Sequence, residues 1–229
     1  VAAVNPLEKT YSTNRDLLFV LGMSMIRAGQ LSEGVQRIQK IAESSNAADM
    51  YLIVARTYLQ LSDHERAGVA VQAAMRLKPD LPGLLTVRGM WMEKIGDHEG
   101  AAAILEKALV ENTDDFQAHL HLGAIRYVQR DLPAARKHLT RALQLDSISP
   151  LARYEMALVE RAEGNLQAAV AHLEEVVKGT PKWLQPHIEL AALYYRVKRP
   201  ADGARERAIV DKLSSEEHTQ ELESLGIKQ

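Results

Sequence analysis

The chain has 229 residues with 28 basic and 30 acidic side chains, a net charge of −2 at pH 7, and no cysteine. A charge so close to balance gives no long-range attraction to nucleic acid or to an anionic membrane, and the lack of cysteine excludes disulfides and thiolate metal sites. With 46% hydrophobic but only 5% aromatic residues, the composition favours helices. No apolar run approaches the ~20 residues that span a bilayer, and no signal peptide is visible. We therefore expect a soluble protein without membrane insertion, and the sequence does not choose between cytoplasm and periplasm.

Small residues recur along the chain with one period. In two parallel series, the first step is 33 residues and each later step is 34 residues. The first series is Gly22, Ala55, Gly89, Gly123, Ala157 and Ala191, and the second is Gly34, Ala67, Ala101, Ala135, Ala169 and Gly203. Because small side chains allow two helices to approach closely, each series marks one helix of a repeated pair.

A turn is predicted between the two helices of each pair. The turns are Gly29-Gln30, Ser62-Asp63, Gly96-Asp97, Arg130-Asp131, Gly164-Asn165 and Lys198-Arg199. Glycine suits the end of a helix, and Asp or Asn suits the N-cap of the next one. On both sides of each turn, apolar residues fall at i, i+3, i+4 and i+7, which predicts amphipathic helices.

In chain order, residues 1–14 form an N-terminal extension or the tail of a preceding repeat, and six helix pairs follow. The pairs occupy residues 15–47, 48–81, 82–115, 116–149, 150–183 and 184–217. In the last pair, Pro200 opens the second helix, and Gly203 and Arg207 replace an alanine and an apolar residue. These replacements predict a looser terminal unit.

A short capping helix is predicted after the last pair, over residues 218–229. Ser214-Ser215-Glu216-Glu217 has the pattern of a capping box that would open this helix. Leu222 and Leu225 would face inward and Gly226 would end it. Such a polar helix is expected at the end of an array of repeats, where it shields the last apolar surface from water.

These residues resemble the tetratricopeptide repeat (TPR) family. The family pattern has a bulky residue, Leu-Gly and Tyr in the first helix, and Ala, an apolar residue and Ala in the second. The second unit reads Tyr51, Val54-Ala55, Tyr58, Ala67, Val71, Ala74 and Pro79, and the fourth reads His119, Leu122-Gly123, Arg126, Ala135, Leu139, Ala142 and Ser147. The resemblance covers nearly the whole chain and implies an all-α fold. It implies a right-handed superhelical α-solenoid of six TPR helix–turn–helix units plus a short C-terminal capping helix.

The sequence carries no signature of catalysis. It has no glycine-rich phosphate loop, no Gly-x-Ser-x-Gly elbow and no His-Glu-x-x-His helix. Most histidines fall at equivalent positions of different repeats: His64 with His98, His119 with His187, and His138 with His172. Repeat duplication explains this placement better than a metal-ligand cluster does. We therefore expect no enzyme activity, no cofactor and no metal site.

The resemblance implies that the first helices of the pairs line a concave groove, and this groove holds the candidate partner-binding residues. They are Phe19, Met23, Arg27, Arg56, Met90, Tyr127, Tyr154, Arg161, Tyr195 and Arg196. Apolar side chains mixed with Tyr and Arg are typical of partner sites, so we expect a protein or peptide in the groove. The competing interpretation is that neighbouring first helices bury these side chains against one another. The Lys/Asn/Arg clamp with which some family members hold a C-terminal carboxylate has no counterpart at the matching positions.

Several alternatives remain open at this level. The chain could be the partner-recruiting TPR region of a larger enzyme whose catalytic domain lies outside it. Binding of nucleic acid by basic residues such as Arg136, Lys137 and Arg141 is disfavoured, because they lie among acidic residues on an outer helix. Self-association through open solenoid ends is a further alternative. Arg126 and Glu160 occupy equivalent positions of successive units, and we expect them to form an ion pair.

Overall fold

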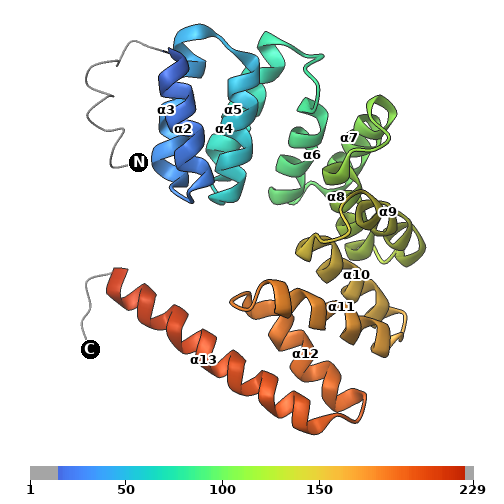
Figure 1. The fold of residues 1–229 in the computed structure, drawn as a ribbon. Helices are drawn as coiled ribbons and strands as arrows, with labels where there is room; N and C mark the ends of the chain where they lie inside the picture. The colour runs from blue at the N-terminus through green and yellow to red at the C-terminus, as the bar shows by residue number, and fades with distance from the viewer. Residues whose placement is uncertain (1–14, 225–229) are drawn as a thin grey trace. The chain divides into compact units, whose positions relative to one another are not determined.

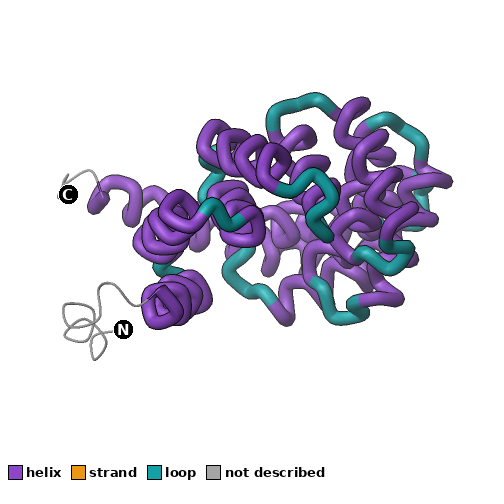
Figure 2. The backbone as a smooth tube through the Cα atoms, turned by 90° about the horizontal axis from the view of Figure 1, so that it is seen from above, coloured by secondary structure: helices purple, strands orange, loops and turns teal. Residues whose placement is uncertain are grey.

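A computed structural model describes residues 15–224, and the described chain consists of helices joined by short loops (Figure 2). The all-α prediction is confirmed. The expected extension over residues 1–14, together with Leu225 and Gly226, lies outside the described residues. The chain divides into two compact units, residues 1–121 and 122–229, which are taken separately below.

The first unit holds three helix pairs in which each helix packs against the next one along the chain (Figure 1). Its helices are α2 (Arg15–Arg27), α3 (Leu31–Ser45), α4 (Ala48–Gln60), α5 (His64–Leu77), α6 (Leu84–Lys94) and α7 (His98–Glu111). The first helices α4 and α6 also contact each other. Ile38, Val54, Val71 and Val87 lie in one buried cluster, so α3, α4, α5 and α6 share a continuous core.

The second unit repeats this arrangement. Its helices are α8 (Phe116–Val128), α9 (Leu132–Leu145), α10 (Pro150–Ala162), α11 (Leu166–Gly179), α12 (Leu184–Arg196) and α13 (Pro200–Ser224), with the first six residues of α8 belonging to the first unit. From α9 onward each helix packs against its successor. Val170, Leu173, Leu190 and Leu193 form a buried cluster between α11 and α12. Each of the first five ranges expected from the sequence contains one pair of helices, and the sixth contains α12 and the part of α13 up to residue 217.

All six turns inside the helix pairs use one left-handed residue. Positive φ angles between 57° and 88° occur at Gly29, Ser62, Gly96, Arg130, Gly164 and Lys198. After each of these residues, a backbone N–H donates to a carbonyl five residues earlier, for example from Asp131 to Arg126 at 2.9 Å. This hydrogen bond is the mark of a Schellman motif, which satisfies the free carbonyls of the helix end. The Asp63, Asp97 and Asp131 carboxylates then accept from the backbone N–H three residues on, which caps α5, α7 and α9 as predicted.

The small residues mark the points of closest approach between paired helices. A Cβ atom added at Gly123 would lie 2.5 Å from Cγ of Leu139, and one added at Gly89 would lie 2.5 Å from Cγ of Leu105. Both leucines are fully buried. A larger side chain at either glycine would force the two helices of its pair apart. The recurring small residues therefore mark the close approach that the sequence predicted.

The C-terminal helix differs from the prediction. Instead of a separate capping helix after residue 217, α13 runs without a break from Pro200 to Ser224. Ser214 and Glu217 lie in its interior, because no glycine or proline between Gly203 and Gly226 interrupts the helix. The inward side of Leu222 lies outside the described side chains. The terminal pair is also not looser at Gly203, which is buried: a Cβ there would lie 2.8 Å from the ring of Tyr195.

The left-handed turns make a testable prediction at Arg130. A side chain with a Cβ is strained at the Arg130 φ of 66°, whereas glycine is not. Arg130 is exposed, so Arg130→Gly should raise the free energy of unfolding by about 0.5–1 kcal/mol. Chemical denaturation measures this change, and Arg130→Ala is the matched control, which loses the same side chain but keeps the strain. Equal stability of the two variants would contradict the assigned turn geometry.

Candidate functional site

Polar contacts connect the first helices of successive repeats. In the first unit, Nδ1 of His121 on α8 lies 2.5 Å from a carboxylate oxygen of Glu93 on α6. In the second unit, Nη1 of Arg161 on α10 donates to Oε2 of Glu189 on α12. Both contacts join residues 28 positions apart. In both contacts, a residue in the last turn of the first helix of one pair bonds to a residue in the second turn of the first helix of the following pair.

Arg161 is the centre of a network on the second unit. Its Nη2 donates to the Tyr127 hydroxyl at 3.3 Å, so one guanidinium joins α8, α10 and α12. Burial alone would lower the pKa of Arg161, but the bonds to Tyr127 and Glu189 outweigh it and raise the pKa. Burial, with the nearby Glu189 carboxylate, raises the pKa of Tyr154. Arg161 is therefore held charged and oriented, and the raised pKa of Tyr154 keeps its hydroxyl neutral.

An aromatic pair lies next to this network. The rings of Tyr154 on α10 and Trp183, which precedes α12, have centroids 4.8 Å apart and are tilted by 47°. Of the ten predicted groove residues, Tyr127, Tyr154 and Arg161 are thus brought close together. Sequence reasoning missed Trp183 and Glu189. A signal for Glu189 was present in the sequence: it follows Arg161 by 28 residues, the same spacing that separates Glu93 and His121.

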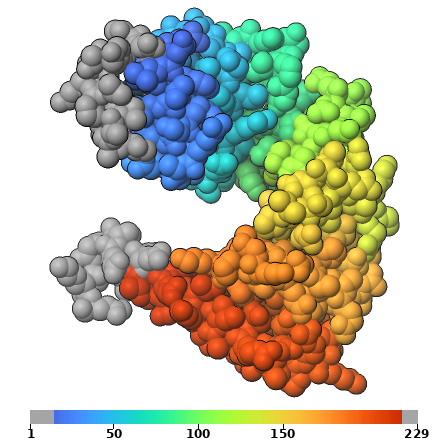
Figure 3. All heavy atoms as spheres, in the orientation of Figure 1, coloured from blue at the N-terminus to red at the C-terminus, as the bar shows by residue number. Residues whose placement is uncertain are grey.

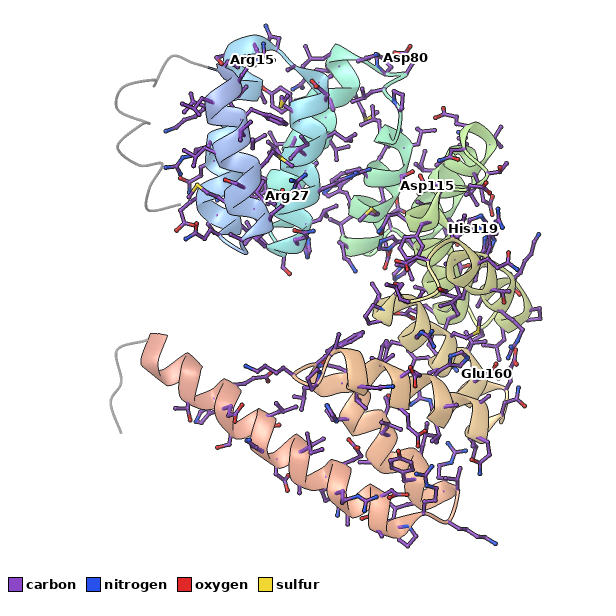
Figure 4. The ribbon with its side chains drawn as sticks, viewed as in Figure 1. Arg15, Arg27, Asp80, Asp115, His119 and Glu160 are labelled. Carbon is purple, nitrogen blue, oxygen red and sulfur yellow. The ribbon has the colours of Figure 1, made fainter. Side chains whose placement is uncertain are left out.

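The other predicted groove residues are divided between partial burial and exposure. Phe19, Met23 and Met90 are half-buried and pack against the core of the first unit, as the competing interpretation described. In contrast, Arg27, Arg56 and Arg196 are exposed and make no hydrogen bond or ion pair with another residue in the range 15–224 (Arg27 is labelled in Figure 4). Tyr195 is 44% exposed. The predicted set therefore contains both half-buried and exposed side chains.

Large apolar side chains remain exposed on the first helices of the second unit. Val128 on α8 is 59% exposed and Ile188 on α12 is 45% exposed. Ile188 is followed by the exposed Ala192 and Tyr195 at i+4 and i+7, so these residues lie on one side of α12. The first-helix residues Tyr127, Val128, Tyr154, Arg161, Ile188 and Tyr195 of the second unit are together called the first-helix face below.

The expected ion pair between Arg126 and Glu160 is wrong. Glu160 on α10 (labelled in Figure 4) accepts from Nη1 of Arg136 on α9 at 2.8 Å and from the Asn165 amide at 2.9 Å. Arg126 instead donates to Gln129, the residue that follows the end of α8. Arg136 on the second helix α9 is the cation that reaches Glu160. The equivalent positions 126 and 160 of the first helices α8 and α10 therefore do not form the expected pair. The Arg136 bond lowers the pKa of Glu160 despite the burial of its carboxyl group.

One pair of repeated histidines, His119 and His187, holds loops in place. Nε2 of His119 (labelled in Figure 4) lies 3.1 Å from the Thr113 carbonyl, and Nε2 of His187 lies 3.1 Å from the Pro181 carbonyl. Arg153, at the equivalent position between them, donates to the Ser147 carbonyl. Each contact spans six residues and fastens the loop that precedes a first helix. Within residues 15–224, no three His, Asp or Glu side chains are arranged to hold a metal ion.

Over the same described range, none of the helices combines the length and the apolar content that crossing a bilayer requires.

The comparisons with known proteins agree with the repeat assignment. Profiles of the tetratricopeptide repeat family match residues 48–81, 93–150 and 125–183, which is more than half of the chain.

Individual relatives are longer than this chain. It is 26% identical over 160 residues to the Homo sapiens Protein O-mannosyl-transferase TMTC1, covering 68% of this chain and 18% of that protein. It is 25% identical over 163 residues to a TPR repeat-containing protein of Pseudomonas aeruginosa, covering 69% of this chain and 27% of that protein. The chain therefore spans less than a third of the length of these relatives.

Among solved structures, the APC/C hetero-tetramer Cut9–Hcn1 contains a chain of similar fold. Its TM-score is 0.83 at 17% sequence identity, and the alignment covers 92% of this chain and 42% of that chain. At this level of identity the likeness concerns the fold alone.

The Glu160 contacts predict a loss of stability in Glu160→Gln. Because the folded pKa of Glu160 lies below its ordinary 4.5, its stabilisation is present above pH 4.5 and is lost as pH falls through the lowered value. We expect Glu160→Gln to unfold more easily at pH 7 by about 1–2 kcal/mol, and this difference to shrink below about pH 4. Chemical denaturation at both pH values measures it.

Glu163→Gln is the control, since Glu163 bonds to the same Arg136 but is exposed. It should cost less than Glu160→Gln, and neither variant should change partner affinity. A Glu160→Gln chain as stable as the unmodified one at pH 7 would show that the pair with Arg136 does not stabilise the fold.

Proposed function

Because the chain belongs to the tetratricopeptide repeat family, we propose that it is a non-catalytic scaffold whose first-helix face binds a segment of a partner protein. Repeats of this family generally mediate protein interactions. The observation that carries the proposal is the exposure of Val128, Ile188 and Tyr195 on first helices of the second unit, beside a fixed Arg161. Exposed apolar residues next to oriented polar groups are the usual composition of a peptide-binding surface.

The network around Arg161 supports binding because it is formed before a partner arrives. Tyr127 and Glu189 fix the guanidinium, so little side-chain entropy is lost when a partner covers it. The Tyr154–Trp183 pair adds rigid aromatic surface of the kind that contributes most to affinity at interfaces. Phe19, Met23 and Met90 in the first unit are half-buried against the core, as Tyr154 is in the second unit, so only the exposed part of each side chain can contact a partner.

A second candidate function follows from the relatives. The human relative is named as a mannosyl-transferase, and the chain corresponds to 18% of its length. By analogy, this chain would recruit a substrate protein or a partner for a catalytic domain carried elsewhere in a longer protein. Both candidate functions use the same binding face. They differ in whether a catalytic domain belongs to the same polypeptide. The sequence of the full reading frame distinguishes them.

The binding face is tested by removing its aromatic side chains. A partner is first captured from an extract of the source organism on the complete chain, identified by mass spectrometry, and titrated by calorimetry. Tyr127→Ala combined with Tyr154→Ala should weaken binding at least tenfold, because two anchors are lost. Tyr127→Phe removes only the hydroxyl that accepts from Arg161, so it should retain the fold and weaken binding less.

Lys137→Ala on α9 is the matched control, because this exposed residue lies on a second helix of the same unit. Its affinity should equal that of the unmodified chain. Unchanged affinity of the double tyrosine variant, with its helical content intact, would contradict binding at the first-helix face.

A further inference from the structure

The last helix pair departs from the other five at one core position. Five repeats place an aliphatic residue there, and all five side chains are fully buried: Ile38, Val71, Leu105, Leu139 and Leu173. The sixth repeat has Arg207, and its side chain is exposed. An aliphatic residue here would be expected if the position served packing alone, so the arginine needs another explanation.

Arg207 covers an aromatic ring instead of filling the core. Its guanidinium carbon lies 5.9 Å from the ring centroid of Tyr195, a cation–π contact between α13 and α12. The ring reaches this place because Gly203 has no side chain: a Cβ there would lie 2.8 Å from the ring. The two helices pack side by side along their shared length (Figure 3, orange to red). Tyr195 nevertheless remains 44% exposed, so one part of its ring is available to a partner.

Two arginines of this helix pair, Arg196 on α12 and Arg207 on α13, have no acidic partner in the described part of the chain. The neighbouring acids already have partners: Glu189 bonds to Arg161, Glu206 bonds to His187, and Asp202 bonds to Arg199 and Arg205. Asp211, one turn beyond Arg207, is exposed and makes no ion pair with it. The surface therefore carries a local positive charge although the chain as a whole has a net charge of −2.

The charge lies next to an apolar stripe. Ile188, Ala192 and Arg196 follow one another at steps of four residues on α12, so Arg196 ends the line that Ile188 begins. We propose that Tyr195, Arg196 and Arg207 form a subsite that binds a partner peptide through a carboxylate placed beside an apolar side chain. The apolar side chain lies on Ile188 and Ala192, and the carboxylate meets the two arginines. This subsite deepens the proposed function and rests on it.

A peptide fits this surface better than a nucleic acid does. Binding of a phosphate backbone needs a row of cations, whereas the first helices of this unit alternate cations with Glu189 and with apolar residues. An arginine pair beside an aliphatic stripe matches an Asp or Glu side chain next to Leu, Ile or Phe.

The test is selection of peptides from a random 12-residue library displayed on phage, with the complete chain immobilised. The unmodified chain should select peptides in which Asp or Glu adjoins an apolar residue. The double variant Arg196→Gln/Arg207→Leu should lose that preference, and it restores the aliphatic residue of the other repeats, so it should keep its fold. Selected peptides, measured by fluorescence polarisation, should bind the double variant at least tenfold more weakly. Arg205→Gln is the control, because Arg205 is exposed on the same helix but bonds to Asp202.

The outcomes separate the subsite from the function on which it rests. Selected peptides without acidic residues, or with equal affinity for the double variant, would overturn the subsite and leave peptide binding by the scaffold intact. If no peptide is selected, both proposals are contradicted. Binding of a 20-residue oligothymidylate that the double variant abolishes would also overturn the proposal, since it would assign the two arginines to phosphate.

Discussion

Each helix pair of this chain can bury its apolar surface only against the next pair, and this constraint shapes both sides of every helix. The residues that face a neighbour are small or aliphatic, because two backbones meet there. Gly89 and Gly123 show how tight the contact is, since neither position has room for a single additional carbon atom. Stability in such an array is close to a sum of the contacts between neighbours. The opposite sides of the helices are free to vary, and the proposed binding residues lie there.

The first helices show how this freedom is used. In the first unit their large side chains, such as Phe19 and Met90, lean toward the core. In the second unit the equivalent surface carries Tyr127, Arg161 and Glu189 in one hydrogen-bonded network, with apolar residues left in water beside it. A network of this kind costs desolvation energy and contributes little net stability. What it provides is a fixed geometry, which is more useful for recognition than for folding.

Much of the fold could be predicted from the sequence because the period repeats every constraint six times. The two series of small residues located the helix pairs, and the turn residues located the turns. The left-handed conformation at Ser62, Arg130 and Lys198 was not predicted. Helix contacts and turns depend on the few residues around them, and because these residues recur in each repeat, a single sequence was enough to find them.

The misses involve contacts that the period does not encode. Glu160 pairs with Arg136 from a second helix, and Trp183 reaches Tyr154 from the loop before α12. Helix α13 continues past residue 217 because a capping-box pattern starts a helix only where the preceding chain is not already helical. The family resemblance indicated which helices carry the candidate site. Which of their side chains bury each other depends on packing that a sequence pattern does not contain.

If neighbour packing leaves the first helices as the binding face, a bound partner protects those helices. Amide hydrogen exchange of the complete chain, measured with and without a saturating selected peptide or captured partner, detects this protection. Binding should slow exchange in α10 and α12 and leave exchange in α9 and α11 unchanged. Slower exchange confined to α9 and α11 would instead show that partners bind the second helices.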